Sequence, residues 1–208
     1  MSDTAKISDE ERILAAMAYG EASNKDVPEE IAALAFVLVR QRDARGYSDM
    51  STFVTKDQTF SFVVKDCNQR YAKFKKATEA EIAANPGMAA ALDAARKALA
   101  NEGTDYSNGA YFWDGADIKS NYKNHFKVKH GIKFTDPAHN IYDIKESTKL
   151  VIITKTIVKK KKGKVISSET VEVARYDHVY DSTAAYGGTI FWKNNPDYVK
   201  ATGAKEYK

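Results

Sequence analysis

The run IAALAFVLV at residues 31–39 is the feature that most constrains how this chain can fold. Nothing in the run is charged or strongly polar, and helix-starting signals come just before it. Asp26 with Glu29 three residues later matches a reciprocal helix cap, and Pro28 suits a first helical turn. A helix without a polar face is stable only when other elements pack around it. The run therefore predicts a central helix inside a globular protein.

Further helices are predicted on both sides of this run. Ser8 and Glu11 match a second capping box, followed by an apolar pattern of helical period that Gly20 is expected to end. Residues 88–100 have the composition of another helix, whereas residues 51–66 are expected to be extended or irregular. The first half of the chain is therefore predicted to be mainly helical.

The second half has a different texture. Residues 104–146 are rich in Tyr, Phe, Trp, Asn and Gly, which favours loops and short elements. Residues 149–176 contain two β-branched runs around a Lys/Gly turn, the pattern of a β-hairpin. We predict an α+β protein with a mainly helical core at residues 1–146. A basic β-hairpin and aromatic extension, residues 147–208, is expected to pack on that core.

Charge and cysteine content limit the partners and the compartment. A net charge of +4 and an isoelectric point of about 8.9 favour an anionic partner, such as nucleic acid, an acidic membrane surface or an acidic polysaccharide. No apolar run approaches the roughly 18 residues of a membrane span, so we expect no membrane insertion. The first residues, MSDTAKISDEE, lack the basic start and apolar core of a signal peptide. Cys67 is the single cysteine, which excludes an internal disulfide and a thiolate-rich metal site.

Residues 19–30, YGEASNKDVPEE, contain the carboxylates best placed for chemistry. Cleavage of a glycosidic bond generally needs one protonated carboxylic acid and a second group that assists water or the sugar cation. Glu21 follows a helix C-terminus, whose negative dipole end and apolar surroundings should raise the pKa of its carboxyl group. Asp26 and Glu29 are assigned to helix capping, whereas Glu30 has no capping role. We therefore expect Glu21 to be the acid and Glu30 to be the second carboxylate.

The segment from Ile13 to Arg42, ILAAMAYGEASNKDVPEEIAALAFVLVRQR, resembles bacterial cell-wall hydrolases of the spore-cortex-lytic type. In that family an apolar helix is followed by Tyr-x-Glu-Ala, a short loop, and a second helix rich in small residues and Val that ends in Arg. The resemblance continues through DQTFSFV, ALDAARKAL, GAYFWDG and AHNIYDI, and it covers residues 9–144 in the expected order.

The resemblance implies a lysozyme-like fold that cleaves the glycan strands of peptidoglycan, with Glu21 as the catalytic acid. Members often carry a second acid a few residues later, where this chain has Lys25, so hydrolysis and lytic transglycosylation both stay open. The spacing of Glu21 and Glu30 is similar to that in phage-type lysozymes, which favours hydrolysis with Glu30 assisting water. The residues expected to bind sugar are Tyr19, Gln58, Phe60, Ser61, Tyr111, Phe112, Trp113, Asp114 and His139, with a weaker second set of Phe191, Trp192 and Asn195.

Four other interpretations of the sequence compete with this one. Cys67 with a downstream histidine could form a Cys–His peptidoglycan amidase, and a non-catalytic glycan-binding module would share the aromatic residues and the charge. A metal site built from His125, His130 and His139 has no recognised spacing, so no metal ligand and no cofactor is predicted. The KKKKGK segment, residues 159–164, is read as a solvated hairpin tip, and no nucleic-acid partner is expected.

The prediction for the biology is a monomeric muramidase that acts on peptidoglycan. Synthesis in the cytoplasm without a signal peptide suits a phage endolysin or the toxic domain of a secretion-system effector, acting in the periplasm or cell wall of a target bacterium. For an effector, the producing cell needs an immunity protein that covers the cleft.

Overall fold

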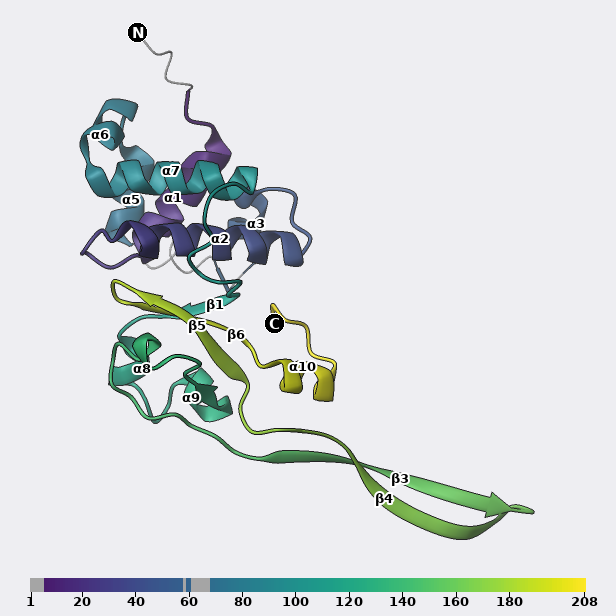
Figure 1. Ribbon diagram of the computed structural model, residues 1–208. Coiled ribbons are helices and arrows are strands. Elements are labelled where there is room, and N and C mark those ends of the chain that lie inside the picture. The colour runs from purple at the N-terminus through teal and green to yellow at the C-terminus, as the bar shows by residue number, and fades with distance from the viewer. Residues whose placement is uncertain (1–5, 58, 61–67) are drawn as a thin grey trace.

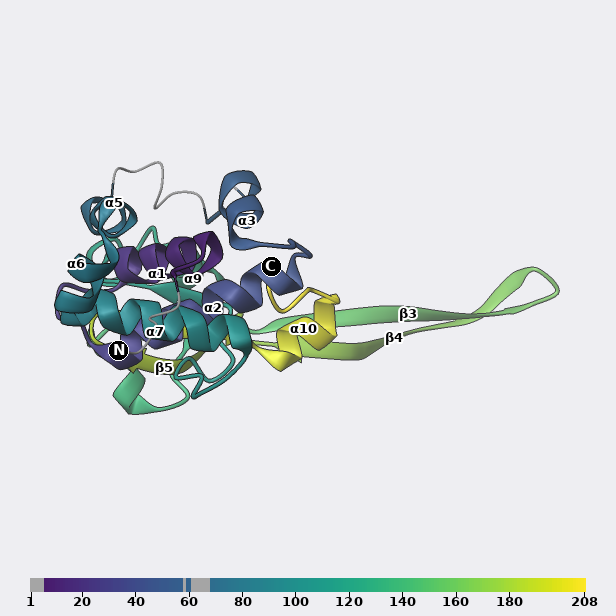
Figure 2. The same ribbon diagram turned by 90° about the horizontal axis from the view of Figure 1, so that it is seen from above.

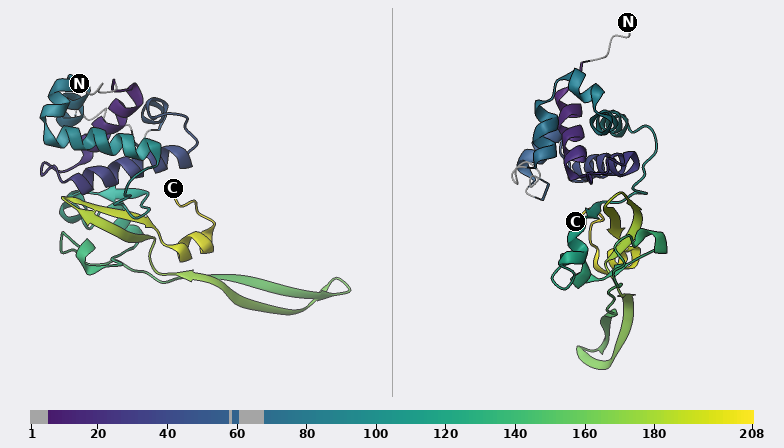
Figure 3. Two further views of the ribbon diagram at one scale, coloured as in Figure 1. Left: turned by 45° about the horizontal axis from the view of Figure 1, so that its top comes forward. Right: turned by 90° about the vertical axis from the view of Figure 1, so that its left-hand side faces the viewer.

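Helix α2 (Pro28–Ala44) lies at the centre of the computed structural model, which describes residues 6–57, 59–60 and 68–208. Helices α1 (Asp9–Glu21) and α7 (Pro86–Ala100) pack against one side of α2, and a small sheet lies on its other side (Figures 1 and 3). The side chains of its apolar run are buried almost all round. The prediction of a central helix is confirmed, and the fold class is α+β as predicted.

Two capping predictions had different outcomes. The Ser8 box is present, because the Ser8 hydroxyl accepts a hydrogen bond from the Glu11 amide while the Glu11 carboxylate accepts one from the Ser8 amide. The predicted Asp26–Glu29 cap was wrong. Asp26 has a left-handed backbone (φ 51°) and pairs with Arg70, and α2 starts after Val27 without a side-chain cap. The Asp26 carboxylate forms a long-range ion pair with Arg70 and does not cap the helix.

The remaining helices of this layer cover α1 and α7. Helix α3 begins at Met50, where the Asp49 side chain accepts a hydrogen bond from the Thr52 amide. The expectation of extended or irregular chain was therefore wrong for residues 51–56. α1 also continues through Gly20, which is buried inside the helix and does not end it. The other helices here are α3 (Met50–Lys56), α5 (Gln69–Lys76) and α6 (Glu79–Ala84).

The sheet combines strands from distant parts of the chain, in the order β1-β6-β5-β2. β1 and β5 pair antiparallel with β6, and β2 runs parallel to β5. The boundary predicted at residue 146 falls inside this sheet, since two strands precede it and two follow it. The strands are β1 (Phe112–Asp114), β2 (Ile132–Lys133), β5 (Tyr180–Tyr186) and β6 (Thr189–Asn194).

A second apolar cluster lies on the face of the sheet away from the helices. It includes Ile118, Val128, Ile190 and Trp192, and short elements surround it (Figure 1). These elements are α8 (Asp117–Ser120), α9 (Phe126–His130), the 3₁₀ helix η1 (Pro137–His139) and α10 (Pro196–Thr202). The loops and short elements predicted for residues 104–146 are thus present.

The predicted hairpin is the most prominent feature of the outline. Strands β3 (Val151–Lys161) and β4 (Lys164–Tyr176) form a separate two-stranded sheet that projects from the rest of the molecule as a twisted ribbon (Figure 2). Residues 177–208 return to the body of the protein as β5, β6 and α10. Only the ribbon is therefore an appendage, while the chain after it completes the core.

Candidate functional site

Glu21 is the last residue of α1, with buried neighbours on both sides. Ala22 is the C-cap of α1, and its amide donates to the Ala18 carbonyl at 3.0 Å. Gly20 and Ala22 are buried, whereas Glu21 is half-buried, so its side chain lies at the boundary between core and solvent. This position combines the negative end of a helix dipole with partial access to a ligand.

The indole of Trp113 is the recognisable partner of this carboxyl group. Trp113 lies on β1, and its Nε1 donates a hydrogen bond to Glu21 Oε2 at 3.3 Å. The indole packs against Phe60 with ring centres 5.8 Å apart, and Phe60 packs against Phe53 at 5.0 Å. This aromatic stack fixes the direction of the N–H group. Two residues predicted for the site, Glu21 and Trp113, therefore meet across 92 positions of sequence.

Two aromatic residues predicted to bind sugar are structural supports of this arrangement. Phe60 is only 4% exposed, beneath Trp113, and Tyr19 is 3% exposed. The guanidinium of Arg70 lies 3.8 Å from the centre of the Tyr19 ring, and its Nε donates to the Tyr19 carbonyl at 2.8 Å. Direct sugar contact through these two rings was therefore a wrong prediction, because core packing occupies both.

The structure places Glu30 in the interface between helices and sheet. Its side chain is fully buried, and both carboxylate oxygens accept hydrogen bonds. The Ser23 hydroxyl donates to Oε2 at 2.6 Å, while the Gly188 amide and the Thr189 hydroxyl donate to Oε1 at 3.0 and 2.7 Å. Glu30 thus holds the turn between β5 and β6 against the start of α2. We call these four residues the Glu30 clamp.

Glycine is required at the position next to this clamp. A Cβ atom built on Gly187, which has φ 59°, would lie 2.0 Å from Glu30 Oε2. The Gly-Gly-Thr phrase at residues 187–189 was the sequence signal for this contact, because paired glycines often mark a close approach of backbone to another group. The sequence indicated Glu30 as a residue of interest, but its hydrogen-bond partners in the turn were not predicted.

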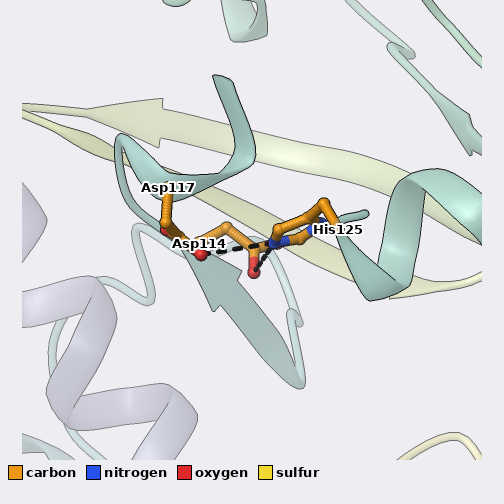
Figure 4. Close-up of side chains that lie close together, drawn as sticks. All are labelled: Asp114, Asp117 and His125. Atoms are coloured by element: carbon orange, nitrogen blue, oxygen red, sulfur yellow. Dashed lines mark ion pairs between the residues drawn. The ribbon is translucent and has the colours of Figure 1, made fainter. Parts of the chain in front are cut away.

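Asp114 belongs to an ion-pair cluster on the far side of β1. Successive strand residues point to opposite faces, so Asp114 faces away from the indole of Trp113. His125 Nε2 lies 3.3 Å from one oxygen of Asp114 and 3.3 Å from one of Asp117 (Figure 4). Lys127 Nζ lies 2.9 Å from Asp114. The hydrogen bond that His125 donates to the Asp114 carboxylate raises the pKa of His125. The side chain of Asp114, which was predicted to bind sugar, is only 9% exposed and pairs within this cluster.

The same cluster is the one described group whose spacing would suit a metal ion. Asp114, Asp117 and His125 each offer a ligand atom within 4.8 Å of the others. The ammonium group of Lys127 also pairs with Asp114, while Asp114 Oδ2 and His125 Nδ1 are buried without a hydrogen-bond partner among the described residues. His130, another histidine considered for a metal site, is not part of this cluster, and its Nδ1 forms a hydrogen bond with the Phe126 carbonyl.

The other predicted sugar-binding residues lie apart from Glu21 or inside the core. Tyr111 is half-buried beneath Arg40 and lines a hollow with Pro196 and Glu206. His139 Nδ1 lies 2.9 Å from the Ser182 hydroxyl against β5, and burial lowers the pKa of its imidazole. The weaker second set is core, and Phe112 packs edge-on against Tyr180. The buried members of that set are Phe191, Trp192 and Asn195.

Three predicted residues lie outside the described part of the chain: Gln58, Ser61 and Cys67. Glu29, assigned to capping, lines a hollow between α2 and α7 with Ala32 and Ala94. Within the described ranges, no helix is both long and apolar enough to cross a membrane. Comparison of the chain with protein families, with curated proteins and with solved structures found no match.

Proposed function

We propose that this protein cleaves the glycan strands of peptidoglycan, as a muramidase with a lysozyme-like core. The observation that supports the proposal most directly is the contact between Trp113 Nε1 and Glu21 Oε2 at the C-terminal end of α1. The family resemblance implies Glu21 as the acid. Its carboxyl group is half-buried and accepts a hydrogen bond from the indole of Trp113. No cofactor is needed for this chemistry.

Glu21 is proposed to protonate the oxygen of the leaving sugar. Its carboxyl group lies at the C-terminal end of α1, which is the negative end of the helix dipole. The indole N–H holds one oxygen of the carboxyl group by its hydrogen bond. Trp113 is a positioning residue in this scheme, because its ring is locked by the stack on Phe60.

The proposed role of Glu30 in activating water has less support than that of Glu21. A general base must approach the water that it activates within hydrogen-bond reach. Both oxygens of Glu30 instead accept hydrogen bonds from the clamp, and the side chain has no exposed surface. This observation favours lytic transglycosylation as the second candidate, because that reaction needs one carboxyl group and uses the hydroxyl of the substrate.

Digestion of purified peptidoglycan with mass spectrometry of the products tests both candidates. Glu21→Gln should abolish release of muropeptides, while Glu29→Gln, the same chemical change eight residues later, should leave release unchanged. Reducing ends indicate hydrolysis and anhydro ends indicate transglycosylation. Released stem peptides that depend on Cys67 would replace the proposal with an amidase. Binding to the wall without any product would replace it with a glycan-binding module.

The biological setting is part of the same proposal. A monomer that attacks peptidoglycan would act in the periplasm or cell wall of a target bacterium, after phage lysis or delivery by a secretion system. In the second case an immunity protein would protect the producing cell by covering the surface around Glu21. Purification of the protein with a co-expressed neighbouring gene product would test that partner.

A further inference from the structure

The ribbon formed by β3 and β4 has few contacts with the rest of the protein. At its base, the amide of Lys149 donates to the Asp177 carbonyl at 2.6 Å, and the Tyr176 ring packs edge-on against Tyr198 at 5.2 Å. Beyond that base both strands extend away from the body (Figures 1 and 2). Eleven residues of β3 at ~3.3 Å each give an arm of about 35 Å. A two-stranded ribbon alone is only marginally stable in water, so this arm lacks the usual support of a core.

Apolar side chains are concentrated on this unsupported arm. Seven of the nine large apolar side chains that are exposed among the described residues lie between positions 150 and 173. Near the tip, Val165 is 58% exposed and Ile166 is 62% exposed. Ile157 and Val158, further along β3, are 45% and 44% exposed. Scattered exposed apolar residues are ordinary, but a concentration on one projecting element indicates a surface that is covered in use.

Positive charge is concentrated on the same arm. Residues 149–176 contain eight basic and two acidic side chains, a net charge of +6, whereas the whole chain carries +4. The rest of the protein therefore has a net charge of −2. Five of these lysines surround the turn at Gly163, at positions 159–162 and 164. The basic character of this protein is thus a property of the ribbon and not of the region around Glu21.

Exposed apolar side chains together with lysines favour one class of binding partner for the arm over the others. A second copy of the ribbon would bring two lysine-rich edges together, and edge lysines are a means by which sheets avoid such pairing. A soluble polyanion would satisfy the lysines but would leave Val165 and Ile166 exposed to water. An anionic lipid bilayer satisfies both, because lysines bind headgroup phosphates while apolar side chains enter the boundary with the acyl chains.

We propose that the tip of the β3–β4 ribbon binds the headgroup region of an anionic phospholipid bilayer. Lys160, Lys161 and Lys162 provide the electrostatic attraction, and Val165 and Ile166 provide apolar contact at the interface. The ribbon holds the body of the protein about 35 Å from the lipid surface. This proposal does not rest on the proposed glycan cleavage, because it concerns a different part of the molecule.

Sedimentation of the full chain with lipid vesicles tests the proposal. Vesicles of phosphatidylcholine mixed with phosphatidylglycerol should bind the protein, and vesicles of phosphatidylcholine alone should not. Each lysine near an anionic surface contributes a factor of about five, so changing Lys160, Lys161 and Lys162 to Gln should weaken binding about a hundredfold. The matched control changes Lys119, Lys123 and Lys129 to Gln, exposed residues of the body that alter net charge equally. It should bind within a few-fold of the parent.

A second variant separates a lipid surface from a soluble polyanion. Val165→Ser with Ile166→Ser keeps every charge and should weaken vesicle binding about tenfold or more, because apolar contact is lost. Its binding to inorganic polyphosphate should be unchanged. Two results would overturn the proposal: equal binding by the two lysine variants, or unchanged vesicle binding by the serine variant. Far-UV circular dichroism of each variant checks that the arm is still folded.

Discussion

Replacing Glu30 by glutamine keeps the size of the side chain and removes its charge, which separates a clamp from a catalytic base. The amide oxygen can still accept from the Gly188 amide and the Thr189 hydroxyl, and the Ser23 hydroxyl can rotate to accept from the new NH₂ group. Hydrogen bonds to a charged group contribute about 1 kcal/mol more than neutral ones, and removal of a buried charge offsets part of that. We expect Glu30→Gln to lower the free energy of unfolding by about 2 kcal/mol.

Urea denaturation measures that loss, and release of muropeptides from peptidoglycan measures function. A clamp predicts that Glu30→Gln keeps turnover within a few-fold of the parent under conditions where the variant is folded. A general base contributes about a hundredfold or more to the rate. Loss of turnover by that factor, with the free energy of unfolding unchanged, would refute the clamp and restore Glu30 as a catalytic residue.

The neighbouring glycine gives an independent check of the same reasoning. Gly187→Ala introduces a Cβ atom 2.0 Å from Glu30 Oε2 and also strains a backbone with φ 59°. The cost should be about 3 kcal/mol or more with Glu30 present. In a Glu30→Ala background only the backbone strain remains, so the added cost should fall to about 1 kcal/mol. Additive free energies in this double-mutant cycle would contradict the contact.

Three further predictions concern other parts of the molecule. Trp113→Phe removes the indole N–H and keeps the aromatic stack, so turnover should fall about tenfold with a shifted pH profile and little change in unfolding. Two carboxylate partners raise the pKa of His178. The stability that protonated His178 gives to the folded protein is therefore complete below the unfolded pKa of about 6.5, and it is lost as pH rises through the folded pKa. Urea midpoints should therefore decrease from pH 6 to pH 9, and His178→Gln should flatten that decrease. Arg45→Met leaves the buried Asp57 carboxylate without its ion partner, which lies at 2.9 Å, and should cost about 3 kcal/mol in urea denaturation.

Each of these three has a result that would contradict it. Unchanged turnover in Trp113→Phe would mean that the indole N–H does not position the acid. A urea midpoint that rises between pH 6 and pH 9 would reverse the sign expected from His178. For Arg45 the comparison is Arg175→Ala, which breaks an exposed pair with Glu172 and should leave the midpoint unchanged. Equal effects of the two arginine changes would remove the distinction between buried and exposed pairs.

Local signals in the sequence predicted the fold where local interactions decide it. The Ser8 cap, the apolar α2 and the β3–β4 ribbon depend on residues close in sequence, and all three are present. Asp26 has the same local pattern as Ser8, but its ion pair with Arg70, 44 positions away, overrides it. The strength of a cap cannot be read from spacing when a distant charge competes for the same side chain.

The two residues of the candidate site could be predicted from the sequence, but their surroundings could not. Glu21 and Trp113 were both identified, because one follows a helix end and the other belongs to an aromatic phrase. The aromatic phrase itself could not be divided into core and site, since that depends on which face of β1 each side chain occupies. Two of the three partners of Glu30, Gly188 and Thr189, lie 158 and 159 positions away, and no local pattern connects them to α2.

The strand order of the sheet also determines when the region around Glu21 can form during synthesis. β1 carries Trp113, yet its sheet partner is β6, in the register Trp113 with Phe191. The strand that carries the indole therefore gains its sheet partner only after the ribosome has made almost the whole chain, including the ribbon between them. Contacts so distant in sequence form slowly and late in folding. A nascent or C-terminally shortened chain would carry Glu21 on a formed helix but without an oriented partner, and it should be inactive until β6 has docked.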